Sequence, residues 1–259
     1  RRTDRSPSAG IVVPMCGIVG YVGPQNALDV VLEGLRRLEY RGYDSAGVAV
    51  LADGELSTAK KAGKLSNLEK ALAEQGLPEA TIGLGHTRWA THGGPTDRNA
   101  HPHLSADGRV AVVHNGIIEN FAALRAHCED AGVEFRSETD TEVVAHLLAA
   151  EYEGTEPGEG RLAAAMRAVS RRLEGAFTLV ATHADEPDTI VGSRRNSPLV
   201  VGVGDGEYFL GSDVAAFIGH TREARELGQD QVVEIDRTRG LTVTDFAGAV
   251  VEPTAYTVD

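Results

Sequence analysis

The residue with the greatest chemical potential is Cys16, which follows Met15 and precedes Gly17 and a short apolar run. A chain that begins at Cys16 carries a thiol and a free α-amine on one residue. These groups titrate near pH ~8.5 and ~7.7–8, so one residue could supply both a nucleophile and its base. Taken alone, the cysteine also fits a small buried hydrophobic residue. Residues 1–15 matter here, because an upstream extension removes the free amine.

A second polar segment, residues 86–95, follows an apolar stretch and is too polar to lie in a core. It contains Arg88, Trp89, Thr91 and His92. A guanidinium binds a carboxylate through two parallel hydrogen bonds, so Arg88 predicts a site for a carboxylate ligand. A salt bridge in a surface loop is the alternative. A metal hydrolase is another alternative, because five histidines fall within 29 residues, but the spacings typical of zinc sites are missing.

Two further clusters place polar groups at the ends of predicted elements. Asn115 and Gly116 follow the apolar run 110–113, where an amide side chain and a glycine N–H can form an oxyanion hole. A plain Asn-Gly turn is the alternative. Asp140 lies at the predicted start of a helix, where the ordinary role of an aspartate is capping. Its functional interpretation is a carboxylate that faces a substrate ammonium group.

Five motifs, in order along the chain, resemble the N-terminal-nucleophile glutaminase domains of class II glutamine amidotransferases, most closely those of the glutamine–fructose-6-phosphate aminotransferase family. They are CGI at 16–18, YRGYDSAG at 40–47, HTRWATHG at 86–93, HNGIIEN at 114–120 and SETDTE at 137–142. The related amidophosphoribosyltransferases and asparagine synthetases share the first motif and the Asn-Gly pair, but they look different at the second and third. The resemblance covers residues 16–259.

This resemblance implies that L-glutamine is hydrolysed to glutamate and ammonia through a thioester on Cys16, with the α-amine as base and without a cofactor or metal. Asn115 and Gly116 would hold the oxyanion. Arg88 would bind the α-carboxylate of glutamine, and Asp140 would bind its α-ammonium group. The other implied pocket residues are Trp89, Thr91, His92 and Arg41. The arginine among these would help to close the site.

The resemblance also implies partners outside this chain. Full-length members of the family are much longer than 259 residues. Their second half binds fructose-6-phosphate, so this chain would supply ammonia for glucosamine-6-phosphate synthesis only when that half is present, in a homodimer of the full-length enzyme. Two alternatives stay open. One is the glutaminase domain of an amidotransferase that makes phosphoribosylamine or asparagine. The other is a silent glutamine-binding domain in which residues 1–15 are retained.

The composition is typical of a globular protein, with 42% hydrophobic and 24% charged residues. The formal net charge of −13 argues against nucleic acid or an anionic membrane as the main partner. Two cysteines, Cys16 and Cys128, provide no disulfide framework and favour a reducing cytoplasm. We expect Cys128 to be structural. No apolar run approaches the ~18–20 residues of a membrane span.

The elements that must position these residues follow from periodicity and turn signals. Helical spacing of apolar residues predicts helices over 26–39, 65–75, 118–131, 139–151 and 161–173, with a short helix over 221–227. Asp-Gly pairs beginning at 53, 107 and 205 predict hairpins and hence antiparallel sheets. The helices occur in blocks, which favours an α+β fold. The resemblance implies a four-layer αββα sandwich of two antiparallel sheets, the N-terminal nucleophile hydrolase fold.

We expect three parts along the chain. Residues 1–15 are a disordered or removable extension, and residues 16–246 are the glutaminase domain. Residues 247–259 are small and polar, and they are expected to begin a linker to a sugar-isomerase half.

Overall fold

The computed structural model describes residues 16–259, and the extension expected over residues 1–15 lies outside the described residues. One sheet consists of β1 Gly17–Val22, β2 Ser45–Ala52, β3 Glu55–Ala62, β4 Ile82–Arg88, β9 Val200–Val203, β10 Tyr208–Gly211, β11 Glu223–Glu226 and β14 Thr254–Thr257. The other consists of β5 His103–Leu104, β6 Val110–Ile118, β7 Gly175–His183, β8 Thr189–Arg195, β12 Gln231–Asp236 and β13 Gly240–Asp245. The helices are α1 Ala27–Leu38, α2 Leu65–Glu74, α3 Phe121–Asp130, α4 Thr141–Gly154 and α5 Arg161–Arg172.

Neighbouring strands are antiparallel in both sheets. The eight-stranded sheet runs β14-β11-β9-β10-β1-β4-β2-β3, so β1 is an interior strand between β10 and β4. The six-stranded sheet runs β13-β12-β8-β7-β6-β5. Among residues 16–259, no helix is both long enough and apolar enough to cross a bilayer.

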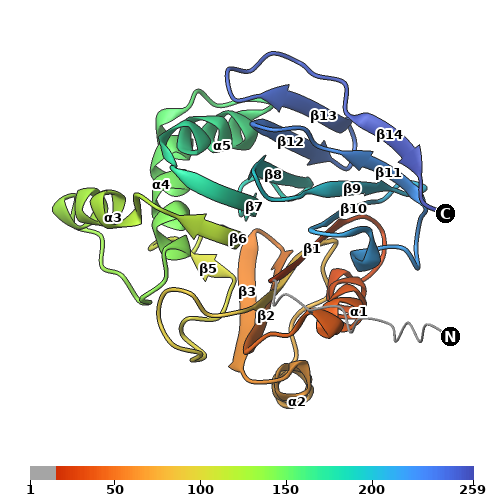
Figure 1. The fold of residues 1–259 in the computed structure, drawn as a ribbon, viewed down its shortest axis with the longest axis horizontal. Coiled ribbons are helices and arrows are strands. Elements are labelled where there is room, and N and C mark those ends of the chain that lie inside the picture. The colour runs from red at the N-terminus through yellow and green to blue at the C-terminus, as the bar shows by residue number, and fades with distance from the viewer. Residues whose placement is uncertain (1–15) are drawn as a thin grey trace, which may run out of the picture.

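The two sheets face one another and carry helices on their outer faces (Figure 1). Buried residues of α1 and α2 pack on the eight-stranded sheet, and those of α4 and α5 pack on the six-stranded sheet. A third apolar layer lies between the sheets, where Ile18 and Leu84 of one meet Val113 and Val180 of the other. The predicted α+β class and the αββα sandwich are therefore confirmed.

The contact between α1 and the eight-stranded sheet shows how the sequence determines this packing. Val31 and Leu35 lie on its apolar face and are buried at 1% and 0% exposure. Burial of such side chains is worth about 1.5–3 kcal/mol each. The helix approaches β4 at Gly85, where an added Cβ would lie 2.3 Å from Cγ1 of Val31. Glycine at this strand position therefore allows the close contact between helix and sheet.

The Asp-Gly pairs form the hairpins that the sequence predicts. Asp53 and Gly54 have φ of 52° and 75° and join β2 to β3. This left-handed pair matches the twist of the flanking strands. The pairs at 107–108 and 205–206 lie between β5 and β6 and between β9 and β10, both antiparallel.

Two predicted elements are wrong in this structure. The short helix expected over 221–227 is instead β11, a strand that pairs with both β9 and β14. The helix expected to begin at residue 118 begins at Phe121, because β6 continues to Ile118. In addition, Thr254–Thr257, within the stretch expected to begin a linker, pairs as β14 with β11.

Candidate active site

Cys16 immediately precedes β1. The beginning of β1 lies beside the end of β4, where Gly17 pairs with Thr87. Two side-chain hydroxyl groups fix the backbone just after Cys16. Gly17 N–H donates to Oγ1 of Thr87 at 3.2 Å, and Ile18 N–H donates to Oγ of Ser212 at 3.0 Å. The position of Cys16 is therefore set by an interior strand that is anchored from its first residue.

A cavity of about 440 Å³ opens at Cys16. The structure brings seven of the residues predicted for the site into its lining, namely Cys16, Arg88, Trp89, Thr91, Asn115, Gly116 and Asp140. They come from the residue before β1, the end of β4 and the loop after it, the second half of β6 and the segment before α4. Four clusters that are far apart in the sequence therefore share one cavity.

The thiol of Cys16 is partly buried and lies against the backbone of Trp89. Trp89 N–H donates to Sγ at 3.2 Å. Burial raises the pKa of the Cys16 thiol, and the hydrogen bond from Trp89 opposes this effect only in part. A thiol with a raised pKa is mostly protonated at neutral pH, so its use as a nucleophile requires a base.

Asn115 reaches Cys16 from the opposite sheet. Its Nδ2 donates to the carbonyl oxygen of Cys16 at 2.9 Å. Gly116 follows it within β6 at a φ of 114°, and an added Cβ would lie 2.1 Å from the carbonyl oxygen of Ala176. Only glycine fits there. The two residues lie inside a strand, so the alternative of a plain Asn-Gly turn is wrong.

Arg88 ends β4, and its guanidinium holds the loop that follows. It donates to the carbonyl oxygens of His92, Gly93 and Gly94, the last two at 3.2 Å. Burial lowers the pKa of Arg88, and the nearby carboxylate of Asp44 opposes this shift. The result is a cationic group at the cavity wall.

Asp140 precedes α4 but does not cap it through its side chain. Its Oδ2 instead accepts from Ile118 N–H at 2.9 Å, while Thr139 Oγ1 accepts from Glu142 N–H at 3.3 Å. Thr139 supplies the side-chain oxygen for this helix terminus, and Asp140 lines the cavity. The capping alternative for Asp140 is therefore wrong.

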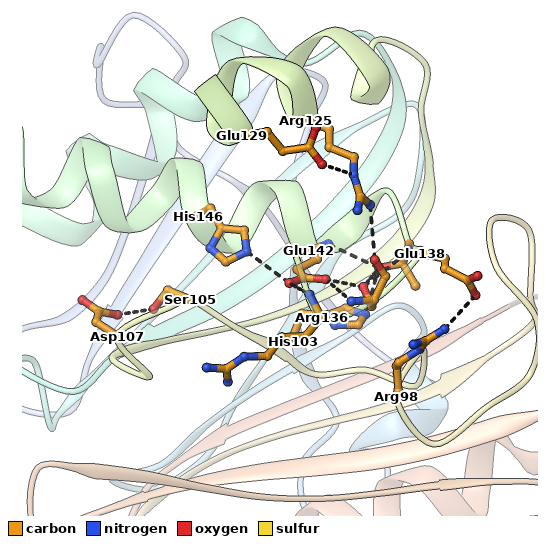
Figure 2. A network of polar contacts seen from close by, with 12 residues as sticks. Arg98, His103, Ser105, Asp107, Arg125, Glu129, Arg136, Glu138, Glu142 and His146 are labelled. Atoms are coloured by element: carbon orange, nitrogen blue, oxygen red, sulfur yellow. Dashed lines mark hydrogen bonds and ion pairs between the residues drawn. The ribbon is translucent and has the colours of Figure 1, made fainter. Parts of the chain in front are cut away.

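The turn before Asp140 is held by Glu142, which Figure 2 shows beside His146. The carboxylate of Glu142 accepts from the N–H groups of Arg136 and Ser137, at 2.8 and 2.6 Å. Burial alone would raise the pKa of Glu142, but its hydrogen bonds with His146, Arg136 and Ser137 lower it to about 2. A charged carboxylate with several donors fixes the backbone that presents Asp140.

Asn99 connects the loop around Arg88 to this turn. Its Nδ2 lies 3.0 Å from both the carbonyl oxygen of Gly94 and Oε2 of Glu138. Its Oδ1 accepts from Glu138 N–H at 3.0 Å. Figure 2 shows that Glu138 also faces Arg98. One buried amide therefore sets the spacing between the cationic and anionic walls of the cavity.

Two predicted site residues do not line the cavity. The guanidinium of Arg41 is paired with the carboxylate of Asp213. The imidazole of His92 packs edge-on against the ring of Phe121, with 4.7 Å between centroids. The roles that the resemblance implies for Arg41 and His92 stay predictions.

Three residues that hold the site together are given no role by any pattern in the sequence. They are His86, Asn99 and Ser212. His86 contacts Asn115, and Ser212 contacts β1 across 194 residues of sequence. The histidines noted in the sequence do gather, since the rings of His86 and His101 stack at 4.1 Å. Among residues 16–259, no group of three or more His, Cys, Asp or Glu side chains is placed to hold a metal ion.

Comparisons with known proteins agree with this geometry. A family model described as a glutamine amidotransferase domain matches residues 86–219. The glutamine–fructose-6-phosphate aminotransferase (isomerizing) of Streptomyces coelicolor is 71% identical over 245 residues, which is 95% of this chain and 39% of that protein. The enzyme of the same name from Leifsonia xyli subsp. xyli is 60% identical, over 94% of this chain and 39% of its own length. The chain therefore spans about two fifths of these relatives.

A solved structure supports the same assignment at greater distance. The glutamine phosphoribosylpyrophosphate amidotransferase from B. subtilis, complexed with ADP and GMP, superposes with a TM-score of 0.73 at 25% identity. The match covers 91% of this chain and 50% of that one. Because the family model covers more than half of the chain and the fold agrees, the chain belongs to the glutamine amidotransferase domain family.

Proposed function

We propose that this chain hydrolyses L-glutamine to L-glutamate and ammonia through a thioester on Cys16. The observation that supports it most is the shared cavity, in which a thiol lies with an amide donor, a cation and a carboxylate. This set matches the three polar parts of glutamine, which are its side-chain amide, its α-carboxylate and its α-ammonium group.

In the proposed reaction, the α-amine of Cys16 takes the thiol proton as Sγ attacks the side-chain carbonyl carbon of glutamine. The oxyanion that forms accepts hydrogen bonds from Nδ2 of Asn115 and N–H of Gly116. Loss of one such donor typically costs about 3–4 kcal/mol of transition-state stabilisation. The α-ammonium group of Cys16 then gives this proton to the departing nitrogen, and the C–N bond breaks to release ammonia. Water hydrolyses the thioester, which restores the thiol and yields glutamate.

The walls of the cavity account for substrate selection. Arg88 is proposed to bind the α-carboxylate and Asp140 the α-ammonium group, with Trp89 and Thr91 beside them. These two charges are opposite in sign and lie in one cavity. They therefore favour free glutamine, which carries both an α-carboxylate and an α-ammonium group, over a glutamine residue within a peptide.

Substitution Arg88→Met is expected to lower kcat/KM for glutamine about 100-fold, mainly by raising KM. The reason is the loss of a charge-assisted contact worth about 3 kcal/mol. Steady-state glutamate release over a range of glutamine concentrations measures kcat and KM separately. Arg36→Met is a matched control, because Arg36 lies on α1 and pairs with Glu69 of α2, outside the residues that line the cavity. A kcat/KM for Arg88→Met within threefold of the parent would remove Arg88 from the proposed carboxylate site.

The test of the proposed function is a glutaminase assay on a chain that begins at Cys16. We expect equal amounts of glutamate and ammonia, and complete inactivation by iodoacetamide with one label on Cys16. Cys128 is buried at 4% exposure, so it should label much more slowly. Activity that survives alkylation but is lost to a chelator would instead favour the metal hydrolase alternative.

We further propose that the ammonia serves the synthesis of glucosamine-6-phosphate from fructose-6-phosphate within a longer protein. Relatives with the matching name are 60–71% identical, whereas the phosphoribosylpyrophosphate amidotransferase structure is 25% identical. This difference favours the aminotransferase over the other amidotransferases. The longer protein is proposed to bind fructose-6-phosphate in its other half, to form a homodimer and to lie in the cytoplasm, as its free cysteines suggest.

The proposed organisation keeps three parts. Residues 1–15 are removed, residues 16–246 form the glutaminase domain and residues 247–259 lead toward the sugar-isomerase half. Pairing of β14 with β11 indicates that part of this last segment also completes the eight-stranded sheet.

A further inference from the structure

The side chain of Asn115 must be oriented before it can stabilise an oxyanion. An asparagine amide has nearly the same shape when it is rotated by 180°, which exchanges its NH2 group and its oxygen. One orientation presents Nδ2 to the nucleophile, and the other presents Oδ1, which would repel a developing negative charge. Something in the protein has to select the first orientation.

The contacts of His86 provide that selection. Its Nε2 lies 2.8 Å from the carbonyl oxygen of His114 and 3.0 Å from Oδ1 of Asn115. A backbone carbonyl can only accept, so the shared Nε2 must carry the hydrogen and donate. Because Nε2–H donates to Oδ1, the other end of the amide, Nδ2, faces the carbonyl oxygen of Cys16 at 2.9 Å.

We propose that His86 is a positioning residue that holds Asn115 with its amide nitrogen toward Cys16, and so assembles the oxyanion hole. The imidazole is fully buried on β4 and is not part of the cavity lining. It therefore acts through Asn115 rather than on the substrate. This inference rests on the proposed glutamine hydrolysis and adds a residue that the five sequence motifs did not single out for a role.

The surroundings of His86 keep its proton on one nitrogen. The groups that face the ring are His101, stacked at 4.1 Å, together with His114 and Arg88. Burial lowers the pKa of His86 to about 3, and the positive charge of Arg88 acts in the same direction. The ring is therefore neutral from pH 5 to pH 8. Its Nδ1 has no hydrogen-bond partner among the described residues, as expected of the nitrogen without a proton.

The first test compares His86→Gln with His86→Met in chains that begin at Cys16. Glutamine can place an N–H donor near the position of Nε2, whereas methionine has a similar shape and no donor. We expect His86→Met to lower kcat roughly 10- to 100-fold with KM within about threefold, because the loss falls on transition-state stabilisation. His86→Gln should retain kcat within about fivefold. Equal losses in the two variants would overturn the proposal.

A double-mutant cycle separates positioning from a general structural effect. In a background of Asn115→Ala there is no amide to orient, so adding His86→Met should change kcat by less than about twofold. Multiplicative losses in the double variant would mean that His86 acts independently of Asn115, and the proposal would then be wrong.

A measurement on the unaltered chain decides the matter if His86→Met fails to fold. Nitrogen-15 NMR of the imidazole should show a neutral ring protonated at Nε2 and bare at Nδ1 from pH 5 to pH 8. A ring protonated at Nδ1, or one that becomes charged in that range, would contradict the proposal. A parent chain that folds but does not hydrolyse glutamine would refute the proposed function, while the NMR result would still report on the orientation of Asn115.

Discussion

Replacement of Cys16 by alanine is expected to abolish glutamine hydrolysis, with a fall in kcat of at least about 10⁴-fold. Removal of the nucleophile from an enzyme that uses a covalent intermediate costs about 10⁶-fold in the best-studied case. No thioester can form without Sγ, although the oxyanion donors and the charged walls of the cavity remain. Glutamate release over hours, measured by coupled assay, gives the residual rate.

The matched control for this variant is Cys128→Ala. Cys128 lies on α3 and packs into the apolar layer between the helices and the six-stranded sheet, outside the cavity lining. Its replacement should therefore leave kcat within about twofold. Cys16→Ala should also still bind glutamine in isothermal titration, because Arg88 and Asp140 are intact. Undiminished hydrolysis by Cys16→Ala would exclude the thioester mechanism.

A chain that begins at Arg1 is expected to hydrolyse glutamine about 10²–10⁴-fold more slowly than one that begins at Cys16. This range is the usual contribution of a general base. Two observations lead to the expectation. Burial raises the pKa of the thiol, and within residues 16–259 the hydrogen-bond contacts of Sγ are with backbone groups, those of Trp89 and of Cys16 itself. The described side chains therefore offer Sγ no hydrogen-bonded base, which supports the proposed role of the free α-amine.

The experiment needs both chains with their N-termini verified by mass spectrometry. A third chain with a single glycine before Cys16 is the sharpest control, since it moves the amine by one residue and changes little else. We expect it to be as slow as the chain that begins at Arg1. For the chain that begins at Cys16, kcat/KM should rise with pH as the amine loses its proton, near ~7.7–8. Equal turnover by all three chains would rule out the amine as base.

Local patterns predicted the fold and the main chemical groups because they depend on near neighbours in the sequence. The amphipathic spacing of α1 and the Asp53-Gly54 turn each report on a few adjacent residues, and both are present as expected. The motifs around Arg88 and Asn115 likewise identified side chains that line the cavity.

Contacts across long stretches of sequence were not predictable in the same way. The hydroxyl group of Ser212 anchors Ile18, 194 residues earlier, through a register between β1 and β10 that no local pattern encodes. The segment that forms β11 has alternating charges that fit a surface helix equally well. Hydrogen bonds with β9 on one side and β14 on the other stabilise the strand over the helix.

The division of the cavity between the two sheets has a consequence for the interior of the protein. Cys16 adjoins the first residue of β1 and Arg88 ends β4, both in the eight-stranded sheet, whereas Asn115 and Gly116 belong to the six-stranded sheet. Packed sheets lie about 10 Å apart, at a distance that the side chains between them determine. The separation between Cys16 and the Asn115–Gly116 pair therefore depends on the thickness of the apolar layer between the sheets, which residues such as Ile18 and Val113 fill. Buried aliphatic side chains that do not line the cavity thus help to set the distance across it.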